Sequence, residues 1–132
     1  MKFLLDTDIC IYLIRRKPRT VLDRLRRCKA GDVGISAISV AELRYGAAKS
    51  RQVQGNQAAV DLFLAPLEIA AFDDRAAEAY GEIRAQLEAK GTPIGPLDLL
   101  IAAHAKGLGI TLVTNNVREF DRVRGLKVER WV

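Results

Sequence analysis

The chain has 132 residues and a net charge of +5, and 49% of its residues are hydrophobic, which is enough for one core and excludes a disordered chain. No apolar run approaches the roughly 20 residues that a membrane-spanning helix needs, and an acid follows the apolar start too soon for a signal peptide. We therefore expect one soluble, cytoplasmic domain over residues 1–132, with no membrane partner.

Short apolar runs alternate with longer segments of helical periodicity along the chain. The expected strands cover residues 2–5, 33–35, 67–72, 110–113 and 127–131. The expected helices cover residues 7–16, 19–30, 39–50, 58–65, 75–90 and 97–106, with a loop or helix break at 51–57 and a helical turn at 117–120. Strands that alternate with helices are typical of a parallel sheet covered on both faces. The sequence therefore predicts an α/β fold, a three-layer α/β/α sandwich with a mostly parallel central sheet.

Three acids, Asp6, Glu42 and Asp98, each stand at the expected beginning of a helix within apolar sequence. A carboxylate near a core is costly unless something compensates its charge, and a cation shared by several carboxylates does so. Hard divalent cations prefer oxygen ligands, and a bound cation can activate water for attack on a phosphate. The pattern predicts a Mg²⁺ or Mn²⁺ site and phosphoryl-transfer chemistry.

Helix capping is a competing explanation for each acid taken alone. Two pairs have the spacing of a capping box: Ser39 with Glu42, and Asn116 with Glu119. Asp6 and Asp8 are suited to cap the first helix, and Asp98 falls where a helix dipole favours an anion. The combination of acids within apolar sequence favours the metal site, because exposed caps usually stand among polar residues.

The positive charge is concentrated between residues 15 and 29, where eight basic residues face a single acid, Asp23. Two interpretations stay open: a solvated helix face, or a basic rim that attracts a polyanion such as RNA. Cys10 and Cys28 lack the spacing of a metal site, so we expect reduced thiols and no zinc. The only histidine, His104, is expected to be structural, which disfavours a metal-free ribonuclease with a histidine acid–base pair.

Four segments occur in order along the chain: FLLDTDICIYL at 3–13, SVAELRYGA at 39–47, GTPIGPLD with IAAHA at 91–105, and VTNN with REF at 113–120. Together they resemble the motifs of PIN-domain ribonucleases, specifically the VapC-type toxins of bacterial toxin–antitoxin pairs. The resemblance implies that Asp6, Glu42 and Asp98 are the catalytic, metal-binding acids and that Thr114 supplies a hydroxyl at the end of the fourth strand. It also implies hydrolysis that leaves a 5′-phosphate and a 3′-hydroxyl.

The fourth acidic position departs from the family pattern. Many relatives carry an Asp directly after the fourth strand, where this chain has Asn115 and Asn116. Glu119 is the nearest acid in that segment and would complete the site directly or through water, so the number of metal ions stays open. Asp8 and the two asparagines are expected to support the ligands, with Asp8 hydrogen-bonded to Asp6 or to a metal-bound water.

The resemblance also implies partners. A VapC-type toxin would be a Mg²⁺- or Mn²⁺-dependent endoribonuclease that cleaves structured RNA, with tRNA as the expected substrate, and so blocks translation. It would be neutralised by a cognate VapB-like antitoxin, would form a homodimer, and would contact DNA only through the antitoxin. Tyr45 and Trp131 are expected to pack in the core or an interface rather than stack on a base.

Two other classes remain as alternatives. A receiver-like signalling domain is also a small parallel α/β protein with clustered acids, and Asp73 and Lys127 would stand in for its acceptor and its lysine. A catalytically inactive RNA-binding module would need only the basic stretch at 15–29. The three motif acids count against the inactive module, and the excess of positive charge counts against the receiver.

Overall fold

The computed structural model describes residues 1–132 and contains one five-stranded sheet with the strand order β3-β2-β1-β4-β5. The strands are β1 (Phe3–Leu5), β2 (Val33–Ser36), β3 (Glu68–Ala70), β4 (Thr111–Val113) and β5 (Val128–Glu129). Every neighbouring pair is parallel, with Leu5 opposite both Ile35 and Val113 at the sheet centre. The predicted parallel α/β architecture is therefore confirmed.

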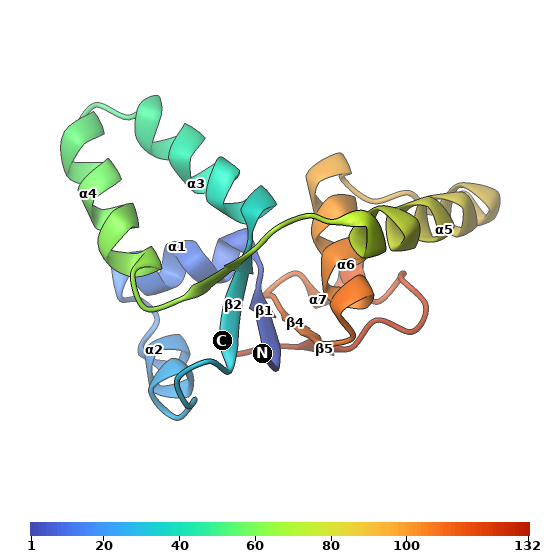
Figure 1. Ribbon diagram of the computed structural model, residues 1–132, viewed down its shortest axis with the longest axis horizontal. Coiled ribbons are helices and arrows are strands. Elements are labelled where there is room, and N and C mark those ends of the chain that lie inside the picture. The colour runs from blue at the N-terminus through green and yellow to red at the C-terminus, as the bar shows by residue number, and fades with distance from the viewer.

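Seven helices connect and cover these strands (Figure 1). They are α1 (Thr7–Arg15), α2 (Arg19–Arg26), α3 (Ala37–Ala48), α4 (Val53–Leu64), α5 (Asp74–Lys90), α6 (Pro96–Leu108) and α7 (Val117–Phe120). The α3–α4 pair and the α5–α6 pair extend in different directions from the sheet (Figure 1). No helix is long and apolar enough to cross a membrane.

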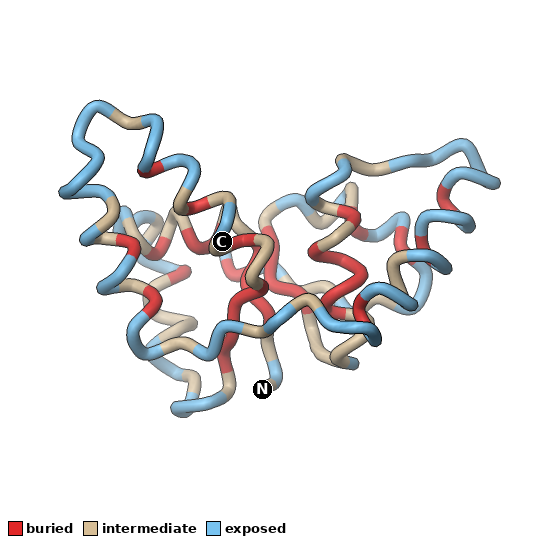
Figure 2. The backbone as a smooth tube through the Cα atoms, turned by 45° about the horizontal axis from the view of Figure 1, so that its top comes forward, coloured by how far each residue is buried: buried red, intermediate tan, exposed pale blue.

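Two hydrophobic cores lie on opposite faces of the sheet, which is the expected three-layer arrangement. Leu5 faces a core built with α1 to α4, whereas Leu4 faces a core built with α5, α6 and α7, because successive strand residues point to opposite faces. Buried positions gather along the strands and on the helix sides that face them, and the outer helix sides are exposed (Figure 2). Trp131 is buried against the edge of Phe3, with ring centroids 5.5 Å apart, as expected for a packing role.

Several helix boundaries differ from the sequence prediction, among them those of α3 and α2. Helix α3 begins at Ala37 because Ser36, at the end of β2, caps it by accepting a hydrogen bond from the Ile38 N–H at 3.0 Å. Ser39 is therefore not the cap, the predicted capping box with Glu42 is wrong, and Glu42 lies in the second turn rather than at the helix start. Helix α2 ends at Arg26, four residues before the predicted end.

The loop or helix break predicted at 51–57 exists but is shorter and earlier, because α3 ends at Ala48 and α4 already begins at Val53. The polar residues that indicated a loop are mostly exposed, and the buried side of this helix carries Val60 and Leu64 in the core shared with α3. Tertiary packing thus sustains a helix through a glycine, Gly55, that would weaken an isolated one.

Candidate active site at the carboxyl edge of the sheet

Asp6 and Thr114 meet where two neighbouring parallel strands end. Asp6 directly follows β1 and Thr114 directly follows β4, so the sheet register places them side by side. The Thr114 hydroxyl donates a hydrogen bond to Asp6 Oδ2 at 2.8 Å, and the Asp6 N–H donates to the Val113 carbonyl at 2.8 Å. Both side chains are buried, so this carboxylate has one fixed orientation.

Asp6 also caps α1, since its Oδ1 accepts the Thr7 N–H at 2.8 Å. The pKa of Asp6 is raised to about 7, mainly by burial and then by the negative charge of Asp8, with a smaller contribution from Glu42, while the two hydrogen bonds oppose the rise. The capping role and a site role therefore coexist in one side chain: Oδ1 holds the helix start, while Oδ2 faces the end of β4.

Glu42 reaches the same edge from α3. The Thr7 hydroxyl lies 2.7 Å from Glu42 Oε1 and 3.0 Å from the Ser39 hydroxyl, so α1 and α3 are joined at this point. Sequence reasoning missed Thr7 as a positioning residue. The feature that could have indicated it is its position directly after Asp6. In the first turn of α1, that position brings the Thr7 hydroxyl to α3.

Asp98 and Glu119 form the other side of the cluster. Asp98 lies half-buried in the first turn of α6. Burial raises the pKa of Asp98 to about 7, with further contributions from a hydrogen bond and the charge of Glu119 and from the charges of Asp6 and Glu42. Glu119 Oε1 accepts the Gly95 N–H at 2.9 Å, so Glu119 satisfies the backbone just before α6.

Gly95 is also close to both of these acids. A side-chain carbon placed on Gly95 would lie 3.4 Å from Asp98 Oδ2 and 3.7 Å from Glu119 Oε1. Asn116 does not cap α7 through its side chain; its amide donates instead to Glu119 Oε2 at 2.5 Å. The predicted capping box at α7 is therefore wrong, because Glu119 is engaged by a residue 24 positions earlier in the chain.

Asp8 stands behind this cluster and is held by the segment after β4. Its Oδ2 accepts the Asn115 N–H at 3.1 Å, whereas its Oδ1 is buried without any hydrogen-bond partner. Burial raises the pKa of Asp8, and the Asn115 bond opposes this rise. The Asn115 side chain donates to the Tyr12 hydroxyl at 3.3 Å, and the Asn116 N–H donates to the Thr114 hydroxyl at 3.0 Å.

The structure therefore brings five carboxylates to one edge without a cationic side chain beside them. The ion pairs of the chain are Arg24–Glu129, Arg26–Asp23, Arg44–Asp61 and Arg84–Glu88, none of which involves these acids. No three acidic, imidazole or thiol groups converge closely enough to enclose an ion by themselves. The donor set fits an open site, in which one or two carboxylates and several waters hold Mg²⁺ or Mn²⁺, and the orphaned Asp8 oxygen fits a group that would accept from a metal-bound water.

His104 lies away from this carboxylate cluster, packed in the fold as expected. Its Nδ1 is 2.7 Å from the hydroxyl of buried Ser36, and its ring meets the edge of Phe72 with centroids 5.4 Å apart. Burial lowers the pKa of His104, so the ring is neutral near pH 7. Cys10 is buried and Cys28 is half-buried, and both are free thiols.

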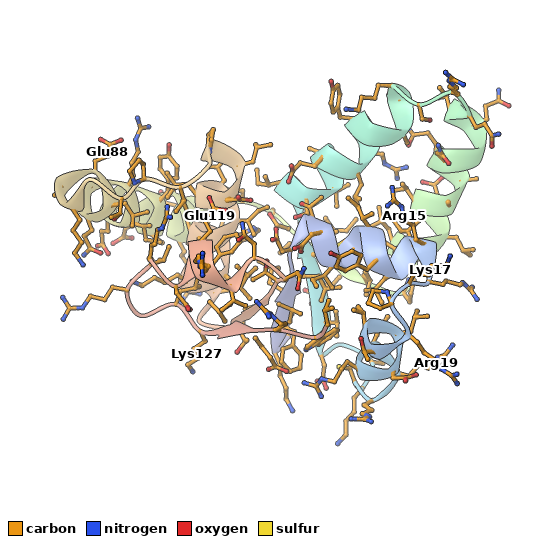
Figure 3. All side chains as sticks on the ribbon, turned by 180° about the vertical axis from the view of Figure 1, so that it is seen from behind. Arg15, Lys17, Arg19, Glu88, Glu119 and Lys127 are labelled. Carbon is orange, nitrogen blue, oxygen red and sulfur yellow. The ribbon has the colours of Figure 1, made fainter.

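The basic stretch at 15–29 lies apart from the acids. Arg15, Lys17 and Arg19 lie at the end of α1 and the start of α2, well separated from Glu119 (Figure 3). Within this stretch Arg24 has a structural role, because it pairs with Glu129 and lies 5.4 Å from the ring centroid of Trp131. The stretch therefore forms a separate surface rather than a direct rim of the carboxylate cluster.

Comparison with known proteins agrees with the fold. The PIN domain profile matches residues 3–126. The chain belongs to the PIN-domain family.

Named relatives indicate which group of PIN-domain proteins the chain is similar to. The chain is 44% identical over 131 residues to the tRNA(fMet)-specific endonuclease VapC of Shigella flexneri, covering 99% of this chain and 98% of that protein. It is 45% identical to the ribonuclease VapC2 of Haemophilus influenzae, strain Rd, over 132 residues. Those residues cover 100% of this chain and 99% of that relative. The resemblance to VapC-type ribonucleases that the motifs indicated is thereby confirmed.

Solved structures give the same result. A chain of DNA-bound VapBC from Salmonella typhimurium superposes with a TM-score of 0.95 at 44% identity, covering 100% of this chain and 99% of that one. A chain of VapBC2 from Rickettsia felis, bound to a promoter DNA fragment, superposes with a TM-score of 0.93 at 42% identity over the full length of both chains.

Proposed function

We propose that this protein is a divalent-cation-dependent endoribonuclease toxin that cleaves tRNA and is neutralised by a VapB-like antitoxin. The observation that carries the proposal is the gathering of Asp6, Glu42, Asp98 and Glu119 at the carboxyl edge of the sheet, with no ion pair to any of them. The relatives named as ribonucleases and as a tRNA(fMet)-specific endonuclease supply the substrate class. Initiator tRNA is therefore the first candidate substrate.

The residues that would hold Mg²⁺ or Mn²⁺ are Asp6 and Asp98, with Glu42 and Glu119 directly or through water. When bound, such an ion lowers the pKa of water and offsets the charge that develops on the phosphate and leaving oxygen. Thr114 and the Thr7 N–H fix the two oxygens of Asp6. The Thr7 hydroxyl fixes Glu42, and the Gly95 N–H fixes Glu119.

Attack of water on the scissile phosphate, with the 3′-oxygen as the leaving group, gives products with a 5′-phosphate and a 3′-hydroxyl, as the resemblance to PIN-domain ribonucleases implies. A histidine acid–base mechanism has no candidate here, because the single histidine is buried against Ser36. The receiver alternative has little support, because Asp73 is engaged as the cap of α5 and accepts the Ala76 N–H at 3.1 Å. An inactive RNA-binding module would not account for four coupled carboxylates held by dedicated donors.

The partners follow from the related assemblies. Similar chains are found in VapBC complexes, two of them with DNA. We infer that a cognate antitoxin covers this chain and carries any contact with promoter DNA, that the toxin forms a homodimer, and that it acts in the cytoplasm, where tRNA is found. We further infer that residues 1–132 act as one domain, since the first and last strands belong to the same sheet.

Incubation of the antitoxin-free protein with initiator and elongator methionine tRNA transcripts tests the substrate. We expect cleavage of the initiator tRNA in Mg²⁺ or Mn²⁺, loss of cleavage in Asp6→Asn, and retained cleavage in Asp74→Asn, which removes an exposed acid of α5 outside the cluster. Addition of the cognate antitoxin should stop the reaction. Folded wild-type protein that cleaves neither tRNA would contradict the proposed substrate.

A further inference from the structure

A groove of about 630 Å³ opens beside the carboxylate cluster, between α1, α3 and α6. Thr7 and Glu42 are among the residues that line it. Its apolar wall residues are Ile11 of α1, Ile38, Ala41 and Tyr45 of α3, and Leu97 of α6. The groove is therefore continuous with the proposed active site, because Thr7 and Glu42 belong to both.

The groove exposes apolar surface that the fold leaves uncovered. Tyr45 is 65% exposed and Leu97 is 46% exposed, so Tyr45 does not pack in the core of this chain, and its packing in an interface stays a prediction. Lys49 lies one turn further along α3, and its Nζ is 4.8 Å from the Tyr45 ring centroid. Lys49 makes no ion pair, so a positive charge stands free above an exposed aromatic face.

We propose that this groove binds an unpaired nucleobase of the RNA substrate, from a nucleotide adjacent to the scissile phosphate, stacked on the Tyr45 ring. The proposal rests on the proposed ribonuclease function and adds a specificity subsite to it. Proteins commonly read single-stranded RNA by stacking splayed bases on aromatic rings, with a basic group near the backbone. Here Tyr45 supplies the ring and Lys49 supplies the charge for the nucleotide's phosphate.

Three features favour a nucleobase over another occupant. Because Thr7 and Glu42 line both the groove and the proposed active site, a base of the cleaved strand reaches the groove without a second molecule. A base is flat and largely apolar on its faces, which matches a wall of isoleucine, leucine and tyrosine. An apolar side chain of a protein partner would leave the charge of Lys49 without a counterpart.

Cleavage kinetics of Tyr45 variants test the subsite. On the tRNA that the wild type cleaves, Tyr45→Ala should lower kcat/KM about 5- to 150-fold, the range that loss of one base–aromatic stack gives. Tyr45→Phe, which keeps the ring, should stay close to wild type. Leu62→Ala is the matched control, because Leu62 is a 74% exposed apolar residue of α4 outside the groove.

A modified substrate identifies the base itself. In a synthetic stem–loop that carries the mapped cleavage site, an abasic nucleotide is placed on one or the other side of the scissile bond. If the base binds the groove, one abasic position should remove the difference between wild type and Tyr45→Ala. Equal losses for Tyr45→Ala on intact and on both abasic substrates would overturn the proposal.

The other occupants give distinct results. Unchanged cleavage by Tyr45→Ala with weakened antitoxin binding would assign the groove to the antitoxin, and unchanged cleavage with a lower oligomeric state would assign it to a second copy of the chain. Either result overturns the subsite and leaves the ribonuclease intact. Wild-type protein that cleaves no tRNA would overturn the proposed function, and the subsite with it.

Discussion

The Thr114 hydroxyl donates to Asp6 Oδ2 at 2.8 Å across the ends of two adjacent parallel strands, β1 and β4. The hydrogen bond joins residues that are 108 positions apart in the chain, and it depends only on the strand register. Parallel strands place their carboxyl ends at one edge of a sheet, which is where α/β proteins commonly bind ligands. The same edge collects Glu42 from α3, Asp98 from α6 and Glu119 from α7.

Replacing Thr114 by Val keeps the shape of this side chain and removes the donor. Because the bond stabilises the ionised form of Asp6, its loss should raise the pKa of Asp6 further above its ordinary value. We expect kcat/KM to fall about 10- to 100-fold near pH 7, as for loss of a hydrogen bond to a charged group, with the acid limb of the pH–rate profile moved to higher pH. Thr111→Val, on the same strand, is the control. An unmoved acid limb would show that Asp6 ionisation does not govern the rate.

Asp98→Asn should separate stability from activity. In the metal-free protein the pKa of Asp98 is about 7, above its ordinary value of 3.8, so the native state binds more protons than the unfolded state between about pH 4 and 7. Stability contributed by this group is therefore lost as pH rises through 7, and Asn avoids the loss. We expect a higher Tm for the variant at pH 8 without metal, and cleavage reduced by more than about 100-fold, beyond the loss expected for a residue that only supports a ligand. A variant that is less stable at pH 8, yet still cleaves, would place Asp98 in a structural role.

Divalent cations should stabilise the wild type more at high pH than at low pH. Asp6 and Asp98 are largely protonated below pH 7, so protons compete with the ion for the same oxygens. We expect the Tm increase caused by Mn²⁺ to be larger at pH 8 than at pH 6, and to be much reduced in Asp6→Asn. Thermal unfolding with Mn²⁺ or with EDTA at the two pH values measures this. Equal increases at both pH values would indicate that the ion binds elsewhere.

His104→Gln should affect folding but not the chemistry. Burial lowers the pKa of His104 below its ordinary value of 6.5, so the unfolded state binds more protons just below that pH and stability falls as pH falls through 6.5. Loss of the Ser36 partner should cost about 1–3 kcal/mol of the free energy of unfolding at pH 7. Urea titration at pH 5.5 and 7.5 measures the free energy of unfolding at each pH. The difference between the two values should be smaller for the variant than for wild type. Abolished cleavage in a folded variant would contradict a structural role.

Two exposed arginines at the C-terminal end of α2 offer a test of the basic stretch. Arg26 and Arg27 are exposed, whereas Arg24 is engaged with Glu129 and Trp131. If the stretch binds RNA, Arg26→Gln with Arg27→Gln should weaken binding and flatten the dependence of log K on log salt by roughly 0.7–0.9 for each phosphate that is no longer neutralised. Arg84→Gln, on the α5 arm, is the control. An unchanged slope would leave solubility or antitoxin binding as the role of this surface.

The sequence predicted the strands, their parallel arrangement and the edge where Asp6 lies, because buried parallel strands are short apolar runs that end at polar residues. The roles of Glu42 and Asp98 were indicated by their apolar surroundings and by family motifs. The position of Glu42 within α3 was not predictable, because Ser36 at the end of a strand competes with Ser39 for the cap and only the strand register decides between them.

The partners of Glu119 were beyond the sequence for a similar reason. Local spacing indicated a cap on Asn116, but tertiary structure brings the Gly95 N–H to Glu119. The hydrogen bond from the Thr7 hydroxyl to Glu42 likewise depends on how α1 packs against α3. The first turns of helix α4 were predicted as a loop or helix break. Their residues are mostly polar, and only a short side of this helix is buried. Local signals thus located the acids, while packing determined which groups hold them.

Product analysis of initiator tRNA, incubated with wild type or Asp98→Asn in Mg²⁺, Mn²⁺ or EDTA, tests whether a metal held at these carboxylates hydrolyses the RNA. We expect wild-type protein to give fragments with 5′-phosphate and 3′-hydroxyl ends in either metal and none in EDTA. Asp98→Asn, whose folded state is checked by a thermal unfolding curve, should give no such fragments in any condition. Cleavage by wild type in EDTA, or fragments that end in a 2′,3′-cyclic phosphate, would contradict hydrolysis by a metal held at these carboxylates.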